Sequence, residues 1–188
     1  MAKTYPARQF KSSPRKQRLR HPVTGFLVGC TDTMFGQAVA DATMDTVQIS
    51  ELGVRELSGE WPIRPSNKSP GLNQDQLEKV ADQLHFRYAK CNGQGWAAVV
   101  KALREERRIV AQLWYATIGG GNIGHAVLLE ALRGSRILFV DPATGKRGWI
   151  SATKVRKAMS DLAVIEGLGP DDLFWGKTAP VPLIAGGA

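Results

Sequence analysis

Cys30, His125 and Asp141 are residues whose types could together perform acyl transfer, and each stands at the end of a predicted helix or strand. Cys30 follows a glycine and precedes apolar residues at helical spacing, which places its thiol at a helix N-terminus. A helix N-terminus favours the thiolate, which is the nucleophilic form of cysteine. His125 begins one apolar run, and Asp141 ends the next. The three side chains can act together only if folding joins the two halves of the chain.

The segment 125–141 is expected to form a β-hairpin that joins the histidine to the aspartate. The start of the first strand in an antiparallel hairpin lies beside the end of the second. An imidazole there could take the proton of Cys30, and a carboxylate on its other nitrogen could orient the ring. Each residue also has an ordinary structural interpretation: a buried cysteine, a histidine at a strand start, and a turn aspartate.

The remaining pattern indicates an α+β fold, with helices first and an antiparallel sheet after them. Apolar spacing predicts helices over 31–45, 49–57, 74–85, 95–108 and 152–162, and strands over 86–91, 109–117, 125–132, 136–141 and 149–151. Asn73 is the expected N-cap of the third helix. Residues 58–73 form a loop rich in proline and glycine. The glycine-rich 118–124 lacks the lysine of a phosphate-binding loop, and a mobile rim beside a site is the preferred interpretation.

The net charge of +8 is concentrated at the N-terminus. Residues 1–22 hold seven of the 25 basic residues and no acidic ones, which leaves 18 basic residues against 17 acidic ones. We expect a basic flexible arm over 1–22, a folded α+β domain over 23–166 and an extended tail over 167–188. The arm would bind a partner subunit or nucleic-acid phosphates nonspecifically, or serve only solubility. Its candidate binding residues are Arg8, Lys11, Arg15, Lys16, Arg18 and Arg20.

Composition limits the classes of function that the chain can serve. A chain of 188 residues fits one domain, and no apolar run suggests a membrane partner. The N-terminus does not resemble a secretory signal, so the expected location is the cytoplasm or a virus particle. Two cysteines, Cys30 and Cys91, fit a reducing compartment, although one bridge between them stays open. We expect no cofactor, and no metal because no zinc-type spacing of cysteine and histidine occurs.

The chain resembles papain-like cysteine peptidases, nearest the bacteriocin-processing (double-glycine) branch. The segments GCTDTMFGQAVADA, GHAVLLEAL and FVDPATG carry the resemblance, which spans roughly residues 24–160. It implies a papain-like α+β fold, with the nucleophile at a helix start packed on a C-terminal sheet. It also implies peptide or amide hydrolysis through a thioester. Cys30 would be the nucleophile, His125 the general base and acid, and Asp141 the orienting residue.

Two positions depart from the pattern of that family. Its members carry a glutamine about six residues before the cysteine, and the amide helps to form the oxyanion hole. Thr24 stands there in this chain, so Thr24 and Asn122 are the near-site candidates, while Gln17 lies in the arm. Asp32 is a like charge near a thiolate. These departures support an alternative: a structural or binding component of a large assembly, plausibly a phage particle, that keeps the fold.

Overall fold

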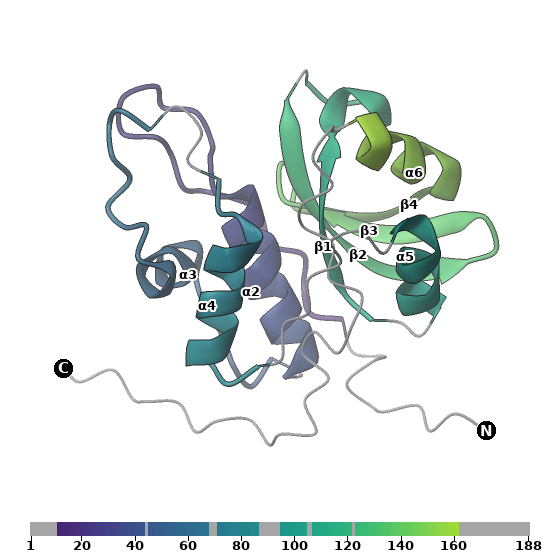
Figure 1. Ribbon diagram of the computed structural model, residues 1–188, viewed down its shortest axis with the longest axis horizontal. Helices are drawn as coiled ribbons and strands as arrows, with labels where there is room; N and C mark the ends of the chain where they lie inside the picture. The colour runs from purple at the N-terminus through teal and green to yellow at the C-terminus, as the bar shows by residue number, and fades with distance from the viewer. Residues whose placement is uncertain are drawn as a thin grey trace.

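The computed structural model describes residues 11–43, 45–67, 71–86, 95–104, 107–121 and 123–161. Within them the helices are α2 (Cys30–Ala42), α3 (Glu51–Ser58), α4 (Gln74–Gln83), α5 (Gly95–Arg104), the short 3₁₀ helix η1 (Tyr115–Ile118) and α6 (Ala152–Asp161). The strands are β1 (Ile109–Trp114), β2 (Gly124–Arg133), β3 (Arg136–Asp141) and β4 (Lys146–Ser151). Figure 1 shows α2, α3 and α4 gathered on one side of the sheet, with α5 and α6 on the other. The expected α+β layout is confirmed.

The strands form one antiparallel sheet in the order β1-β2-β3-β4. The hairpin of β2 and β3 pairs Leu128 with Val140, and a β-bulge between Leu129 and Ala131 shifts the register nearer the turn. Continuing the Leu128 pairing toward the open end leaves the first residues of β2 beside the last residue of β3. The hairpin therefore brings the segment around His125 to the segment around Asp141, as its sequence predicts.

Side chains of β2 alternate between two apolar cores, one on each face of the sheet. Ala126 and Leu128 belong to the core that includes Met34 and Phe35 of α2. Val127 and Leu129 belong to the core on the other face, with these partners from α5 and α6: Val99, Ala102, Leu103, Val155, Ala158 and Met159. Alternation with a period of two directs successive side chains to opposite faces. The sheet is therefore a buried layer that fixes the position of its strand ends.

Helix α2 is buried on all sides because it lies between the sheet and the other helices of its layer. Every residue from 31 to 41 is buried, and α2 contacts both β2 and α3. Gly36 lets the chain pass close: a Cβ there would lie 2.7 Å from the carbonyl oxygen of Ile49. Because burial of apolar side chains contributes about 1.5–3 kcal/mol each, α2 is a rigid support for its first residue.

Residues 11–19 are held against the domain by polar contacts. The amide and the hydroxyl of Ser12 both donate to Asp41 Oδ1 at 2.7 Å, and Arg108 donates to Asp41 Oδ2 at 3.3 Å. Arg147 donates to the carbonyl of Ser12 at 2.9 Å and to both oxygens of Glu130. Asp41, Arg108 and Glu130 are buried, so this network joins α2, the sheet and the N-terminal segment. The described half of the expected arm is thus packed on the domain rather than free.

Several local predictions can be compared directly with the structure. Asn73 caps α4 as expected: its Oδ1 accepts the amide of Gln76, and the Gln76 side chain accepts the amide of Asn73. The strand predicted over 109–117 ends at Trp114, because residues 115–118 turn into η1 and Gly119 follows with φ +102°. The predicted strand over 86–91 lies, after Phe86, outside the described residues, as does the tail over 167–188.

Candidate active site

Cys30 is the first residue of α2, and its thiol is free. Gly29 is the N-cap residue, so no side chain caps the helix. The first amide N–H groups of α2 therefore leave their partial positive charge beside the thiol. A Cβ at position 29 would lie 2.6 Å from Oε2 of Glu51 and 3.1 Å from Cβ of Leu19, so a larger residue here would have to displace the Glu51 carboxylate. The local structure favours a thiolate at residue 30.

His125 and Asp141 meet at the open end of the hairpin of β2 and β3. Nε2 of His125 lies 2.8 Å from Oδ1 of Asp141, and both residues are buried. His125 and Cys30 line the same pocket, and the imidazole lowers the pKa of the thiol. Because Nε2 is bound to the carboxylate, Nδ1 is the nitrogen that remains for the thiol. The structure thus brings together the three residues that the sequence analysis selected.

The protonation of Cys30 and His125 shifts in opposite directions. Burial raises the pKa of the Cys30 thiol, but hydrogen bonding and charge from His125 outweigh it, and the pKa lies below its ordinary value. The amide of Ala126 and the hydroxyl of Thr31 lower this pKa further. Burial lowers the pKa of His125, whereas hydrogen bonds with Asp141 and Cys30 raise it to about 9. The two shifts act in the same sense, since both favour transfer of the proton from the thiol to the imidazole.

Asp141 is bound by more groups than the sequence indicates. Burial raises the pKa of its carboxyl, but hydrogen bonds from His125, Tyr115 and the amide of Ala143 bring the pKa below the usual range. The Tyr115 hydroxyl donates to Oδ2 at 2.7 Å. Tyr115 cannot be singled out from the sequence, because a tyrosine at the end of an apolar strand looks like an ordinary core residue.

Asp32 does not present a free charge to the thiol. Its carboxylate is buried and accepts two hydrogen bonds from Arg55, at 2.7 Å from Nη2 and 3.2 Å from Nε. Arg55 is itself buried, so the two charges neutralise each other inside the helical layer. The expectation that Asp32 acts as an unbalanced like charge is corrected by this ion pair, whose cation the sequence pattern did not identify.

A pocket of about 260 Å³ opens beside the thiol and imidazole. Its other lining residues come from α2, from the segment before α4, from β1 and from the start of β2: Thr31, Gly71, Leu72, Asn73, Gln112, Gly124 and Ala126. Gln112 donates its side-chain amide to the carbonyl of Leu72 at 3.4 Å. This recess is the place where a substrate segment could lie against Cys30. Gln112 was not predicted as a site residue, since the alternation of polar and apolar side chains does not show which end of a strand borders a pocket.

Of the two near-site candidates, only Thr24 lies within the described residues, and it is not brought to the thiol. Thr24 lies in an exposed turn, where its amide donates to Nδ1 of His21, and it does not line the pocket. Its spacing from the cysteine is misleading, because residues 20–27 form a hairpin in which Arg20 pairs with Leu27. Asn122 lies outside the described residues.

The hairpin over 20–27 turns the preceding segment back along the residues before α2. The amide of Val28 donates to the carbonyl of Leu19, and a Cβ at Gly29 would lie 3.1 Å from Cβ of Leu19. The amide of Gln17 donates to the carbonyl of Pro142 at 2.9 Å, directly after Asp141. The Gln17 side chain is buried, and its Oε1 has no hydrogen-bond partner among the described residues. The hairpin therefore returns the segment that holds Gln17 toward the start of α2, although Gln17 is not among the residues that line the pocket at Cys30.

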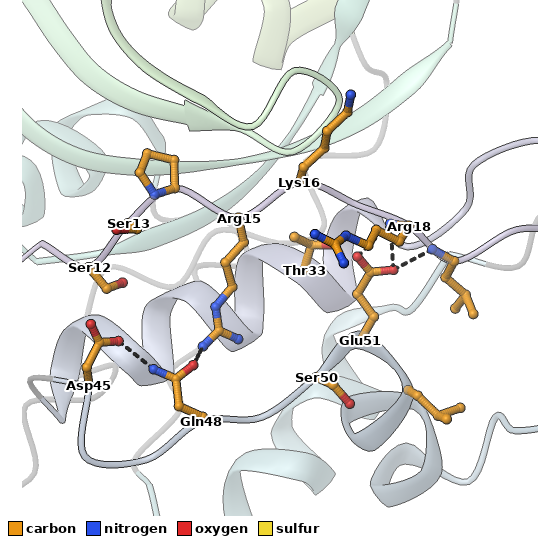
Figure 2. A pocket seen from close by; sticks show the side chains of 13 residues that line it. Ser12, Ser13, Arg15, Lys16, Arg18, Thr33, Asp45, Gln48, Ser50 and Glu51 are labelled. Carbon is orange, nitrogen blue, oxygen red and sulfur yellow. Dashed lines mark hydrogen bonds between the residues drawn. The ribbon is translucent and has the colours of Figure 1, made fainter.

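The basic residues of the expected arm divide into three groups. Arg8 lies outside the described residues, and Lys11 is half-buried. Arg15 donates to Gln48 and to the carbonyl of Ile49, as Figure 2 shows for Gln48. Lys16, Arg18 and Arg20 are exposed. Binding of nucleic acid or a neighbouring subunit through this segment stays a prediction.

A second pocket of about 710 Å³ lies between the N-terminal segment and residues 45–52. Figure 2 shows Arg15, Lys16 and Arg18 along one wall, with Gln48 and Glu51 opposite. It shares no lining residue with the pocket at Cys30. Oxygens of Glu51 accept the amides of residues 18 and 19, so the carboxylate fastens this segment to α3. The cavity is therefore separate from the chemistry of the thiol.

Two further observations concern binding and location. Among the described residues, no group of three or more histidine, cysteine, aspartate or glutamate side chains could hold a metal ion. In the same part of the chain, no helix has both the length and the apolar character needed to cross a membrane. Cys91 lies outside the described residues, so the open question of a bridge to it is not addressed.

Comparison with known proteins supports the fold and not a sequence family. No family model and no curated protein matches the chain. Among solved structures, the peptidase domain of Streptococcus ComA, a bifunctional ABC transporter involved in quorum sensing, matches with a TM-score of 0.55 and 14% identity. That match covers 78% of this chain and 92% of the other.

A C39-like peptidase from Bacillus anthracis matches with a TM-score of 0.58 and 12% identity, over 80% of this chain and 90% of the other. Both matches are to peptidase domains, and both span nearly the whole of the domain compared. At such low identity they establish architecture alone. The chain therefore has the papain-like fold of C39-like peptidase domains.

Proposed function

We propose that this protein is a cysteine peptidase that cleaves peptide or protein substrates through a thioester intermediate. The observation that carries the proposal is the placement of Cys30 at an uncapped helix start, in one pocket with a histidine whose Nε2 is held by Asp141. Opposite pKa shifts of the thiol and the imidazole add to it. The likeness in fold to C39-like peptidase domains is consistent with this activity.

In the first half of the reaction, the Cys30 thiolate attacks the carbonyl carbon of the scissile bond. A C–S bond forms, and the carbonyl oxygen takes the negative charge. The His125 imidazolium then gives its Nδ1 proton to the leaving amine nitrogen, and the C–N bond breaks. Asp141 keeps the ring aligned through Nε2 and stabilises its positive charge. A thioester on Cys30 and a free amine result.

In the second half, neutral His125 takes a proton from water as the water attacks the thioester. The C–S bond breaks, the carboxylic acid product leaves, and the thiolate–imidazolium pair returns. The pocket beside Cys30 would hold the acyl part of the substrate during both steps. No oxidant, metal or further reactant enters this sequence.

The proposed oxyanion donors are the backbone amide of Cys30 and the side-chain amide of Gln17. The first lies at the uncapped N-terminus of α2. The second is supported by the bond from the Gln17 amide to the carbonyl of Pro142, directly after Asp141, and by the burial of the Gln17 side chain. In this proposal Gln17 is the oxyanion donor, although Thr24 occupies the position six residues before the cysteine where the family carries its glutamine.

The proposed nucleophile is tested in a Cys91→Ser background, which leaves residue 30 as the only thiol. Purified protein is incubated with a mixed peptide library, and cleavage is followed by mass spectrometry; iodoacetamide labelling is measured at pH 6. We expect Cys30→Ala to abolish cleavage and labelling, and His125→Ala to slow labelling at pH 6. Cleavage that survives Cys30→Ala would overturn the proposal.

The proposed oxyanion role is tested by comparing Gln17→Ala with Thr24→Ala. Removal of one oxyanion donor costs about 100-fold or more in turnover. Alkylation by iodoacetamide builds no oxyanion, so Gln17→Ala is expected to keep its labelling rate while it loses peptide turnover. Thr24→Ala is expected to retain both. Equal turnover in the two variants would remove Gln17 from the mechanism.

A further inference from the structure

Tyr115 contacts both members of the His125–Asp141 pair. Its hydroxyl donates to Oδ2 of Asp141 at 2.7 Å, while Oδ1 of the same carboxylate is bound to His125. Its ring lies against the imidazole, with centroids 4.2 Å apart and planes tilted by 38°. One side chain therefore binds the carboxylate and covers a flank of the histidine ring.

The hydroxyl of Tyr115 is suited to a permanent donor role. Burial and the neighbouring carboxylate of Asp141 raise the pKa of Tyr115 to about 12, so the proton stays on the phenol at neutral pH. The amide of Ala143 donates to Oδ1 at 2.9 Å and the hydroxyl of Thr144 to Oδ2 at 3.2 Å. These two come from the turn that follows β3, whereas Tyr115 reaches Asp141 from η1.

Gly120 allows the Tyr115 ring to occupy this place. A Cβ built at residue 120 would lie 2.1–2.3 Å from three carbons of the ring, which no real structure tolerates. The amide of Gly120 also donates to the carbonyl of Tyr115 at 2.9 Å. A Cβ at Gly121 would meet nothing within 4 Å. The glycine-rich segment thus has a specific packing role at residue 120, beyond the mobile rim expected from its composition.

We propose that Tyr115 is a positioning residue that holds Asp141 and His125 in line with Cys30, and that Gly120 keeps the Tyr115 ring in place. The catalytic purpose of this arrangement rests on the proposed peptidase function. The arrangement itself is supported by the Tyr115–Asp141 hydrogen bond, the contact between the Tyr115 and His125 rings, and the close approach of residue 120 to the Tyr115 ring. Tyr115 acts through Asp141 and is not itself assigned a proton transfer.

The readout must separate positioning from loss of structure, so it is the pH profile of Cys30 alkylation by iodoacetamide. The charged groups near the thiol–imidazole pair include Asp141 from β3, the ion pair of Asp32 and Arg55 from α2 and α3, and Glu51 of α3, whose carboxylate lies beside Gly29. The Asp32–Arg55 pair is left unchanged in the variants. A shift in the profile therefore reports the alignment of His125 with its carboxylate.

The experiment compares Tyr115→Phe, Gly120→Ala and Gly121→Ala in the Cys91→Ser background. Tyr115→Phe keeps the ring and removes the donor, while Gly120→Ala displaces the ring. We expect both to slow alkylation at pH 6 about tenfold, equal to an upward shift of about one unit in the midpoint of the profile. Gly121→Ala is expected to match the parent, and thermal unfolding confirms that each variant is folded.

An unchanged profile in Tyr115→Phe would overturn the positioning role, whatever the fate of Gly120→Ala. A folded Gly120→Ala variant with the parent profile would overturn the role given to Gly120. Alkylation requires no peptide cleavage, so failure of the proposed function is recognised separately. If no peptide is cut but Tyr115→Phe still shifts the profile, the positioning inference holds and the peptidase proposal fails.

Discussion

Replacing Arg55 by methionine removes the ion-pair partner of the buried Asp32 carboxylate. Both Arg55 contacts are made to one oxygen, Oδ2, while Oδ1 has no hydrogen-bond partner among the described residues. Methionine has a similar length and no charge, so the change removes the cation without opening a large cavity. Breaking a buried pair in this way costs about 3–5 kcal/mol while the remaining group stays charged.

The sign of the pH dependence follows from the folded-state pKa of Asp32. Burial raises this pKa from 3.8 to about 6, although Arg55 opposes the rise. An acid with a raised folded-state pKa stabilises the fold most when it is protonated, so its contribution is complete below pH 3.8 and is lost as the pH rises through 6. The difference corresponds to about 3 kcal/mol. Without Arg55 the pKa rises further, and the loss extends to higher pH.

Urea unfolding followed by tryptophan fluorescence, at pH 5 and pH 8, measures this effect. We expect Arg55→Met to lose about 1 kcal/mol at pH 5, where Asp32 is largely protonated, and about 3 kcal/mol or more at pH 8. Arg104→Met on the exposed end of α5 is the matched control, with little change at either pH. Adding Asp32→Asn to Arg55→Met is expected to remove most of the pH dependence. An equal loss at both pH values would refute this account.

Three further changes test the supports of the site. Asn73→Ala removes the capping box of α4 and is expected to lower the stability of the protein by about 1 kcal/mol, read as a lower Tm. Gly29→Ala places a Cβ 2.6 Å from Oε2 of Glu51 and 3.1 Å from Cβ of Leu19, so we expect a loss of about 1–3 kcal/mol and slower labelling of Cys30. Ser12→Ala removes a buried donor to Asp41 and is expected to cost about 1–2 kcal/mol, with faster proteolysis of the N-terminal segment. These expectations would be contradicted by a parent-like Tm in Asn73→Ala or by parent-like labelling of Cys30 in Gly29→Ala. They would also be contradicted if an added protease cut the N-terminal segment of Ser12→Ala no faster than that of the parent.

Elements whose pattern is local were predictable from the sequence. The cap at Asn73 and the apolar spacing of α4 are local signals, and both are confirmed. The hairpin of β2 and β3 is also local, so the meeting of His125 with Asp141 could be expected from their places at its open end. Cys30 at the start of α2 followed from the glycine and the helical spacing.

Features that depend on distant partners could not be read from the pattern. Arg55 looks like any solvated cation on α3, and only the fold shows that it neutralises Asp32. Residues 11–19 look like a free basic segment, because the acceptors that hold them, Asp41 and Glu51, lie far along the chain. Gln17 lies thirteen residues before Cys30 and belongs to the expected arm, so the sequence does not point to it. The hairpin over 20–27 turns its segment back toward the start of α2.

The bond between Arg147 and the carbonyl of Ser12 joins residues 135 positions apart, and Gln17 likewise bonds to Pro142. During synthesis, Ser12 and Gln17 therefore leave the ribosome long before Pro142 and Arg147, the residues that hold them, have been added to the chain. Contacts of such long range are slow to form because the intervening chain must be ordered first. The thiol emerges early, and its two partners arrive together with β2 and β3. The group of Cys30, His125 and Asp141 therefore cannot assemble in a nascent chain before β3 has been synthesised.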